Sequence, residues 1–219
     1  MSDALWHSGC LSFLPGTQST LGSQINSKEK TMPTKVATTI NGVDVQRLSD
    51  TVTAVKASPE LGSFHFEISN QWIGGGENHS EVLPFSHAGK VVPHKTGMTL
   101  VADEPDALLG TDKGANPVEH LLHALASCVT TSTVYHAAAR GIEVQRVEST
   151  VEGDLDLRGF LDLDPSVRNG FQNIRIKLRI KANATDDQMR ELAQLGPRFS
   201  PVFDTVTRGV RVAVSAERM

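Results

Sequence analysis

A long stretch without charge constrains the fold of this 219-residue chain more than any other feature. Residues 121–134 contain no charged side chain, and their apolar residues surround the helix axis instead of forming one stripe. Before them, Asn116 is a favoured N-cap, Pro117 suits the first helical position, and Glu119 can complete a capping box. The sequence therefore predicts a helix over residues 116–140 that is buried on most of its sides.

The same helix predicts a homodimer. Its remaining positions are small and would let a sheet or a second helix approach the backbone closely: Ala124, Ala126, Ser127, Ser132 and residues 137–139. One chain of this size offers limited cover for so central a helix. We therefore expect two copies to pack together.

Strand patterns lie on both sides of the predicted helix. Upstream, we expect a hairpin around Asn41-Gly42, a helix containing Leu48, Val52 and Val55, a half-buried strand over residues 64–72, and strands over residues 81–83 and 98–102. Downstream, we expect strands over residues 142–157, 174–180 and 210–214, and a helix over residues 186–194 that Gly196 and Pro197 end. This order predicts an α+β fold instead of regular βαβ alternation.

Length and composition predict one globular unit. Residues 1–34 are polar and without a sustained period, which favours a disordered leader, and residues 35–219 would form a single domain. The net charge of -4 and the pI of about 6.1 indicate neither a nucleic-acid nor a membrane partner. The two cysteines, Cys10 and Cys128, fit a reducing compartment, so we expect a cytoplasmic protein.

Cys128 is the candidate nucleophile. It lies about three turns into the predicted helix, where the helix dipole has little effect on a thiol because that effect fades within the first turn. Its helical neighbours, such as Ala124, Leu125 and Thr131, cannot act as a base. A reactive Cys128 would need a cation or a hydrogen-bond network from another segment or subunit. The alternative is a small packing residue of the core.

Three histidines on or near the helix raise the alternative of a metal site. His120 and His123 can share a helix face, but His136 lies more than four turns beyond His120. Zinc needs three or four converging ligands. We therefore expect no metal and no other cofactor.

Two motifs resemble one known family. Residues 109–122, Leu-Gly-Thr-Asp-Lys-Gly-Ala-Asn-Pro-Val-Glu-His-Leu-Leu, and residues 124–128, Ala-Leu-Ala-Ser-Cys, closely resemble the osmotically induced protein C and organic hydroperoxide resistance (OsmC/Ohr) family. Residues 199–202, Phe-Ser-Pro-Val, resemble its second motif, in which a cysteine precedes Pro-Val at the start of a helix. The resemblance covers roughly residues 64–214, with both motifs in the family's order and spacing.

The resemblance implies an OsmC-like fold, in which antiparallel sheets wrap around long central helices in an intertwined homodimer with its active site at the subunit interface. Members with both cysteines reduce organic hydroperoxides. Their helix cysteine attacks as a thiolate and becomes a sulfenic acid, and the second cysteine condenses with it to a disulfide that dithiols reduce. By position, Cys128 would be the attacking residue.

The chain departs from that pattern at Ser200, which stands where the resolving cysteine should be. A hydroxyl cannot form a disulfide, and it can instead cap the helix that Pro201 begins. The carboxylate of the hydroperoxide-resistance branch usually follows Asn-Pro directly, whereas here Glu119 lies one residue later. Glu119 can hold an activating arginine or cap its helix.

The activating arginine of the hydroperoxide-resistance branch is also missing. Arg47 is the only arginine before Arg140, and it lies outside the strand that aligns with the family. Residues 74–80 offer only His79 and Asn78 in place of the arginine. The cation that would activate Cys128 is therefore unidentified.

Together these residues favour a thiol-dependent, hydroperoxide reductase-like protein with Cys128, Glu119 and Ser200 in its site. The substrate would be a fatty or aromatic hydroperoxide, and a small thiol or dithiol would be the reductant. Cys10 could in principle resolve a sulfenate on Cys128, but it belongs to the predicted leader. The alternative is a non-catalytic small-molecule-binding protein that has lost the redox cycle.

Overall fold

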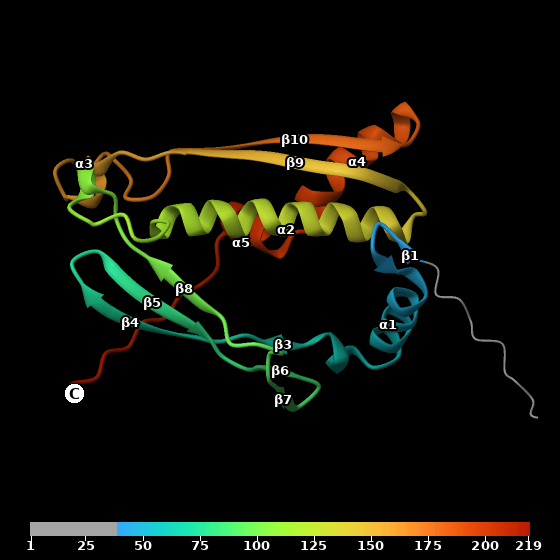
Figure 1. The fold of residues 1–219 in the computed structure, drawn as a ribbon, viewed down its shortest axis with the longest axis horizontal. Helices are drawn as coiled ribbons and strands as arrows, with labels where there is room; N and C mark the ends of the chain where they lie inside the picture. Colours follow the sequence, from blue (N-terminus) through green and yellow to red (C-terminus); the bar gives the residue numbers. More distant parts are fainter. Residues whose placement is uncertain (1–38) are drawn as a thin grey trace, which may run out of the picture. The chain divides into compact units, whose positions relative to one another are not determined.

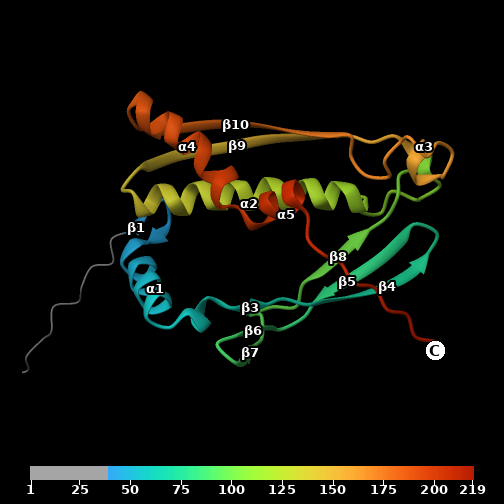
Figure 2. The same ribbon diagram turned by 180° about the vertical axis from the view of Figure 1, so that it is seen from behind.

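The computed structural model describes residues 39–219, which contain five α-helices, two 3-10 helices and ten strands (Figures 1 and 2). The elements before residue 103 are β1 (Thr39–Ile40), β2 (Val43–Asp44), α1 (Val45–Ala57), η1 (Pro59–Gly62), β3 (Phe64–His65), β4 (Ile68–Gly74), β5 (Glu77–Val82), β6 (Phe85–His87), β7 (Lys90–Val92) and β8 (Thr99–Ala102). The elements after it are η2 (Asp106–Leu108), α2 (Pro117–Ala139), β9 (Glu143–Asp154), α3 (Leu157–Phe160), β10 (Asn173–Asn183), α4 (Asp186–Phe199) and α5 (Pro201–Arg208).

All sheets within the described residues are antiparallel, which confirms the predicted α+β class. The hairpin β1–β2 turns at Asn41-Gly42, where both residues have the positive φ that a tight primed turn needs. Two three-stranded sheets follow, in the orders β3-β6-β7 and β4-β5-β8. The long strands β9 and β10 form a separate two-stranded sheet, and β10 alternates exposed basic residues with half-buried apolar ones as its sequence predicts.

The helix α2 begins where the sequence predicts. The side chain of Asn116 accepts a hydrogen bond from the Glu119 N–H at 2.9 Å, and the Glu119 carboxylate accepts one from the Asn116 N–H at 2.9 Å. This capping box satisfies two of the N–H groups that a helix start leaves free. The first turn of α2 is therefore fixed by its own sequence.

One stripe of α2 is buried. It consists of Leu125, Val129, Thr133 and Ala137, spaced four residues apart, and β9, α4 and α5 pack against the helix (Figures 1 and 2). The sequence predicts that α2 is buried on most of its sides. In the single chain this prediction is wrong, because Leu121 is 39% exposed and Tyr135 is 49% exposed. Residues 39–219 thus cover one side of α2 and leave the other side uncovered.

The sequence predicts that α4 ends at Gly196 and Pro197, but in the structure the helix continues to Phe199. A Cβ at Gly196 would lie 2.6 Å from a methyl carbon of Val129 and 2.7 Å from the Thr133 hydroxyl. Glycine is therefore required by close packing of α4 on α2 and does not stop the helix here. The N–H of Ser200 then donates to the Gly196 carbonyl and closes the last turn.

Two strand predictions differ from the structure. The segment over residues 64–72 is divided between β3 and β4, which belong to different sheets, and its apolar side chains are exposed instead of half-buried. The segment over residues 210–214 forms no strand and pairs with none of the strands of the described residues. Both segments have the alternating pattern of a strand without the partner that would bury it. No helix of the described residues is long and apolar enough to cross a membrane.

The core cluster gives a test of this packing. Leu192 is fully buried with Ala137, Ile142 and Leu195. Leu192→Ala is expected to lower the free energy of unfolding by about 2–5 kcal/mol, because it removes buried methyl groups and leaves a cavity. Urea unfolding followed by circular dichroism measures the change. The matched control is Leu163→Ala at a position 68% exposed, where we expect a change within about 0.5 kcal/mol. Similar losses in both variants would contradict this core.

Candidate functional site

Cys128 lies on α2 between two faces of the helix. It is a free, half-buried thiol that flanks the buried stripe at Leu125 and Val129. On its other side the exposed stripe of Ser127 and Thr131 continues along the helix. Cys128 is therefore not enclosed within the single chain, in contrast to the burial that the sequence predicts. The sulfur has no hydrogen bond to another side chain within residues 39–219.

Glu119 and Ser200 both have capping roles in the structure. Glu119 is exposed and completes the capping box of α2, about 13 Å from Cys128 along the helix axis. Ser200 is 2% exposed, and its hydroxyl accepts a hydrogen bond from the Phe203 N–H at 3.1 Å at the start of α5. No hydrogen bond or ion pair of the described residues joins these two side chains to Cys128 or to each other.

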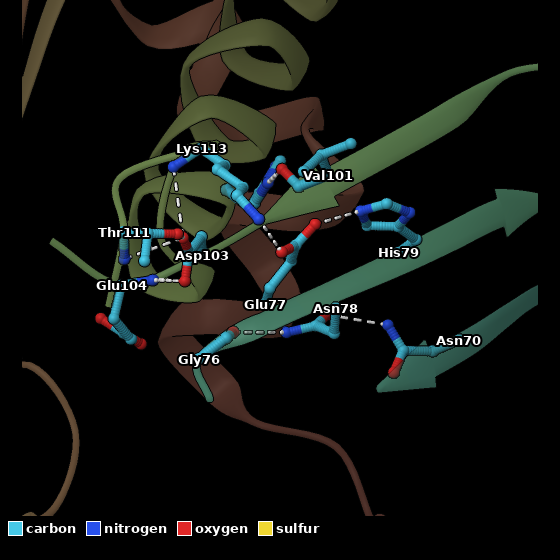
Figure 3. Close-up of polar contacts among 11 residues, drawn as sticks. Asn70, Gly76, Glu77, Asn78, His79, Val101, Asp103, Glu104, Thr111 and Lys113 are labelled. Carbon is cyan, nitrogen blue, oxygen red and sulfur yellow. Dashed lines mark hydrogen bonds and ion pairs between the residues drawn. The ribbon is translucent and has the colours of Figure 1, made fainter. Parts of the chain in front are cut away.

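A buried carboxylate, which the sequence analysis missed, organises the loop that leads to α2 (Figure 3). Asp103 is 1% exposed, and its carboxylate accepts hydrogen bonds from the Thr111 hydroxyl (2.7 Å) and from the N–H groups of Glu104 (2.8 Å), Thr111 (3.0 Å) and Lys113 (3.2 Å). Led by the bond from the Thr111 hydroxyl, these donors lower the pKa of Asp103 to about 2. The motif over residues 109–116 is thus a loop held by one charged side chain.

Close backbone contacts explain the glycines of this loop. A Cβ at Gly110 would lie 1.7 Å from the Glu104 carbonyl oxygen, and one at Gly114 would lie 2.4 Å from the Val101 carbonyl oxygen. The same Val101 carbonyl contacts the His120 ring nitrogen Nε2 at 3.1 Å. The loop therefore connects the edge of β8 to the first turns of α2.

The two faces of the β4-β5-β8 sheet carry different side chains. On one face, Glu77 contacts His79 Nε2 at 2.9 Å and Lys113 Nζ at 2.5 Å (Figure 3). The hydrogen bond from Lys113 is the main cause of the lowered pKa of Glu77, and Glu77 in turn raises the pKa of Lys113. On the other face, the Asn70 amide donates to Asn78 Oδ1 at 2.9 Å and to Ser80 Oγ at 2.8 Å.

Comparisons with known proteins agree with this architecture. Residues 110–215 match the family model described as OsmC-like protein. The structure of an OsmC-like protein from Mycoplasma pneumoniae is 18% identical, with 67% of this chain and 89% of that chain covered and a TM-score of 0.50. Residues 110–215 are therefore similar to the OsmC-like family, and the chain has an OsmC-like fold.

Two further structures are similar at low identity. One is an organic hydroperoxide resistance protein OsmC from Legionella pneumophila, 17% identical, with 65% of this chain and 89% of that chain covered and a TM-score of 0.46. The other is the organic hydroperoxide resistance protein OhrB of Bacillus subtilis, 21% identical, with 66% and 91% covered and a TM-score of 0.39. No curated protein sequence matches the chain.

Two grooves of this OsmC-like domain could admit a small apolar molecule. One of about 500 Å³ lies between α2, β10, α4 and α5, and Leu125 and Val129 line it beside Cys128 in sequence. The other, of about 510 Å³, lies at the start of α2 and is lined by apolar side chains that include Leu155, Leu157 and Phe160. Both are lined mainly by apolar groups, as sites for small apolar ligands are.

Two of the helix histidines, His120 and His136, contact other groups of this OsmC-like domain. His136 stacks on Phe199 with ring centroids 3.8 Å apart, and burial is the main cause of its lowered pKa, followed by the charges of Arg140 and Arg198. Within residues 39–219 no three His, Cys, Asp or Glu side chains are grouped so that they could hold a metal ion.

The charge on Asp103 gives a pH test of the loop. Because the folded state lowers the pKa of Asp103 from 3.8 to about 2, the ionised form stabilises the fold above pH 3.8, and this stability is lost as the pH falls towards 2. Asp103→Asn is expected to destabilise the protein at pH 7 and to flatten the fall in stability between these two pH values. Thermal unfolding at pH 7, 4, 3 and 2 measures both effects.

The matched control for this test is Asp106→Asn, because Asp106 is exposed in the same loop. We expect it to follow the wild-type pH dependence. A wild-type slope in Asp103→Asn would mean that this carboxylate does not anchor the loop.

Proposed function

We propose that this OsmC-like protein is a thiol-dependent organic hydroperoxide reductase that uses Cys128 as its attacking thiolate. The observation that carries the proposal is the position of Cys128, a free and half-buried thiol on the central helix of an OsmC-like domain. Its place after the capped start of α2 matches the helix-cysteine motif of the family. A half-buried thiol is accessible to a small substrate and still has apolar neighbours to bind it.

The proposed chemistry transfers one oxygen atom. The Cys128 thiolate attacks the terminal oxygen of a hydroperoxide, the O–O bond breaks, and sulfur retains that oxygen as a sulfenic acid. The other oxygen leaves as an alkoxide and takes up a proton to give the alcohol. The sulfur is oxidised by two electrons and the peroxide is reduced by two.

The proposed cycle ends with thiols from outside the chain, because Ser200 caps α5 and cannot form a disulfide. A small thiol condenses with the sulfenic acid, water leaves, and a mixed disulfide forms on Cys128. A second thiol, or the other thiol of a dithiol, then exchanges with that disulfide and frees Cys128. Hydrogen peroxide is the poorer substrate in this scheme, because the grooves around α2 favour apolar molecules.

The proposed active form is a homodimer. Large apolar side chains are uncovered on α2 and on the β4-β5-β8 sheet, among them Tyr135 at 49%, Ile68 at 58% and Trp72 at 71% exposure. Soluble monomers seldom expose extended apolar patches, whereas subunit interfaces do. A second copy would cover these surfaces and limit the access of water to Cys128.

A second candidate function is small-molecule binding without turnover. It is favoured by the absence of a hydrogen bond to Cys128 within residues 39–219 and by the apolar groove of about 510 Å³ at the start of α2. In that case Cys128 is a packing residue with the reactivity of an ordinary thiol.

The first test is peroxide consumption with dithiothreitol as the reductant. We expect purified protein to consume cumene hydroperoxide faster than hydrogen peroxide. Cys128→Ser should lower consumption to the level of buffer alone, while Cys10→Ser, the matched control for the other cysteine, should have no effect. Intact mass after one equivalent of peroxide should show a gain of about 16 Da or a thiol adduct. An unmodified thiol and no turnover would favour the binding function.

A second test restores the missing cysteine. In Ser200→Cys, oxidation of Cys128 by cumene hydroperoxide should give an intramolecular disulfide, with a mass about 2 Da below that of the reduced protein. The variant should also lose about 1 kcal/mol of stability, because sulfur is a poor replacement for the capping hydroxyl. The control is the double variant Ser200→Cys with Cys128→Ser. A persistent sulfenic acid in Ser200→Cys would contradict the assignment of position 200 as the resolving position.

A further inference from the structure

The groove at the start of α2 is bounded by two loops that carry exposed apolar side chains. It has a volume of about 510 Å³ and lies between α2, the η2 loop and α3, which is beside η2 in Figures 1 and 2. Its lining includes Leu109 at 93% exposure, Phe160 at 71% and Leu161 at 54%. Exposed apolar surface gathered around a concavity is typical of a ligand site.

The wall that α3 forms is held in place by its own loop. Arg158 pairs with Asp156 at 2.5 Å and with Asp164 at 3.7 Å. A Cβ at Gly159 would lie 2.5 Å from the Arg168 carbonyl oxygen, so α3 packs closely against the backbone of the segment that follows it. The apolar side chains of α3 are therefore displayed by a backbone that the loop fixes.

Leu109 has an unfavourable conformation that no burial in the single chain offsets. Its φ of 63° lies in the left-handed region, which costs a leucine roughly 1–2 kcal/mol. Its side chain is almost fully exposed, so it gains little from the fold around it. An apolar side chain held in water at the edge of a groove gains contacts when an apolar molecule binds there.

One carboxylate lies among these apolar side chains. Glu104 is half-buried and lines the groove, and its carboxylate forms no ion pair or hydrogen bond within residues 39–219. Its backbone is fixed on both sides, because its N–H donates to Asp103 at 2.8 Å and its carbonyl accepts from the Asp112 N–H at 3.1 Å. Figure 3 shows its carboxylate pointing away from the Asp103 carboxylate. A half-buried charge without a counter-ion favours a ligand that supplies one.

The surrounding charge is also negative. Residues 103–119 and 155–172 carry eight acidic and three basic side chains. Lys113 and Arg158 are each paired with an acid. Arg168, the third basic residue, lines an adjoining groove of about 470 Å³. The net charge of these loops favours a cation at the groove and opposes an anionic lipid surface.

The helix start does not reverse this preference. A helix N-terminus attracts anions through N–H groups that are free. In α2 the capping box of Asn116 and Glu119 satisfies two of these groups, and the Glu119 carboxylate adds negative charge to the same turn. The groove therefore has a receptor for a cation in Glu104 and none of comparable strength for an anion.

We propose that this groove binds a small amphipathic cation, with its apolar body against Phe160 and Leu109 and its ammonium group on Glu104. The volume of the groove is within the range of small-molecule sites, about 300–1,000 Å³. The site is separate from Cys128, which lies about 15 Å along α2 from Val118 in the groove lining. Binding here does not rest on peroxide chemistry at the thiol.

Three ligands with one apolar body test the charge preference: phenylhexylamine, phenylhexanol and phenylhexanoate. In isothermal titration calorimetry of the full chain, the amine should bind about tenfold more tightly than the alcohol, because a contact with a charged donor is the stronger one. The phenylhexanoate should bind most weakly. Equal affinities for the three ligands, or no binding of any, would overturn the proposal.

Glu104→Gln tests the receptor for the cation. This variant should lose the preference for the amine and keep its affinity for the alcohol within about twofold. The matched control is Asp106→Asn, because Asp106 is an exposed acid of the same loop that does not line the groove. It should keep the preference. A preference for the amine that survives in Glu104→Gln would remove this carboxylate from the site.

Leu109→Asn separates lost contacts from a lost fold. Asparagine tolerates the left-handed region, so the variant should unfold at the temperature of the wild type or above it. It should nevertheless bind all three ligands at least threefold more weakly, because an apolar wall of the groove is removed. Full affinity in Leu109→Asn and in Phe160→Ser would show that the ligands bind elsewhere.

Two controls distinguish this site from other occupants. Cys128→Ser should bind the amine as the wild type does, and weaker binding would place the ligand beside the thiol instead. Phe160→Ser should sediment as the wild type does in analytical ultracentrifugation, and a changed oligomeric state would mean that a second copy covers the groove. Neither readout uses peroxide, so a failure of the peroxidase and a failure of this site are distinguishable.

Discussion

The central constraint on this structure is that α2 carries no charge over residues 121–134, while the described residues cover only one stripe of it. The stripe from Leu125 to Ala137 is sealed by β9, α4 and α5. Its packing is close enough that Gly196 cannot carry a side chain against Val129. Burial of this stripe stabilises the single chain, and the uncovered remainder of α2 is the reason that we propose a dimer.

The sequence predicted elements whose signals are local. The capping box at Asn116 and Glu119 marks the start of α2, and alternation along β10 marks a strand with one wet face. The Asn41-Gly42 turn likewise needs only its own two residues. The structure confirms these three elements because local conformational propensity and tertiary packing agree at each of them.

Predictions failed where distant residues decide the outcome. Gly196 and Pro197 suggest a helix end, but contact with Val129 and Thr133 requires a glycine inside α4 and keeps the helix intact. The segment over residues 210–214 has the pattern of a strand and no edge to pair with in the described residues. Burial of α2 was overestimated for the same reason, because the described residues leave its second side uncovered.

The site could be predicted in part. The motif positions identify Cys128, Glu119 and Ser200. In the structure Glu119 and Ser200 cap helices, whereas Cys128 has no capping role. Asp103 was missed because its four donors come from residues up to ten positions away and converge only after the loop folds. The signal for it was an acidic residue directly after a predicted strand, followed by the Gly-Thr-Asp-Lys-Gly loop.

Under the proposed function, serine at position 200 changes the chemistry that Cys128 requires more than it changes the fold. A hydroxyl fills nearly the same volume as a thiol and is a better N-cap, so the start of α5 gains a firm hydrogen bond to Phe203. In the proposed cycle, a sulfenic acid on Cys128 then waits for a thiol from solution. Such a thiol has to reach the sulfur, so the side of α2 that a second copy would cover must also leave an opening. In the proposed cycle, a half-buried Cys128 meets that requirement, because the polar stripe of Ser127 and Thr131 can admit a water-borne reductant while the apolar groove lined by Leu125 and Val129 holds the substrate.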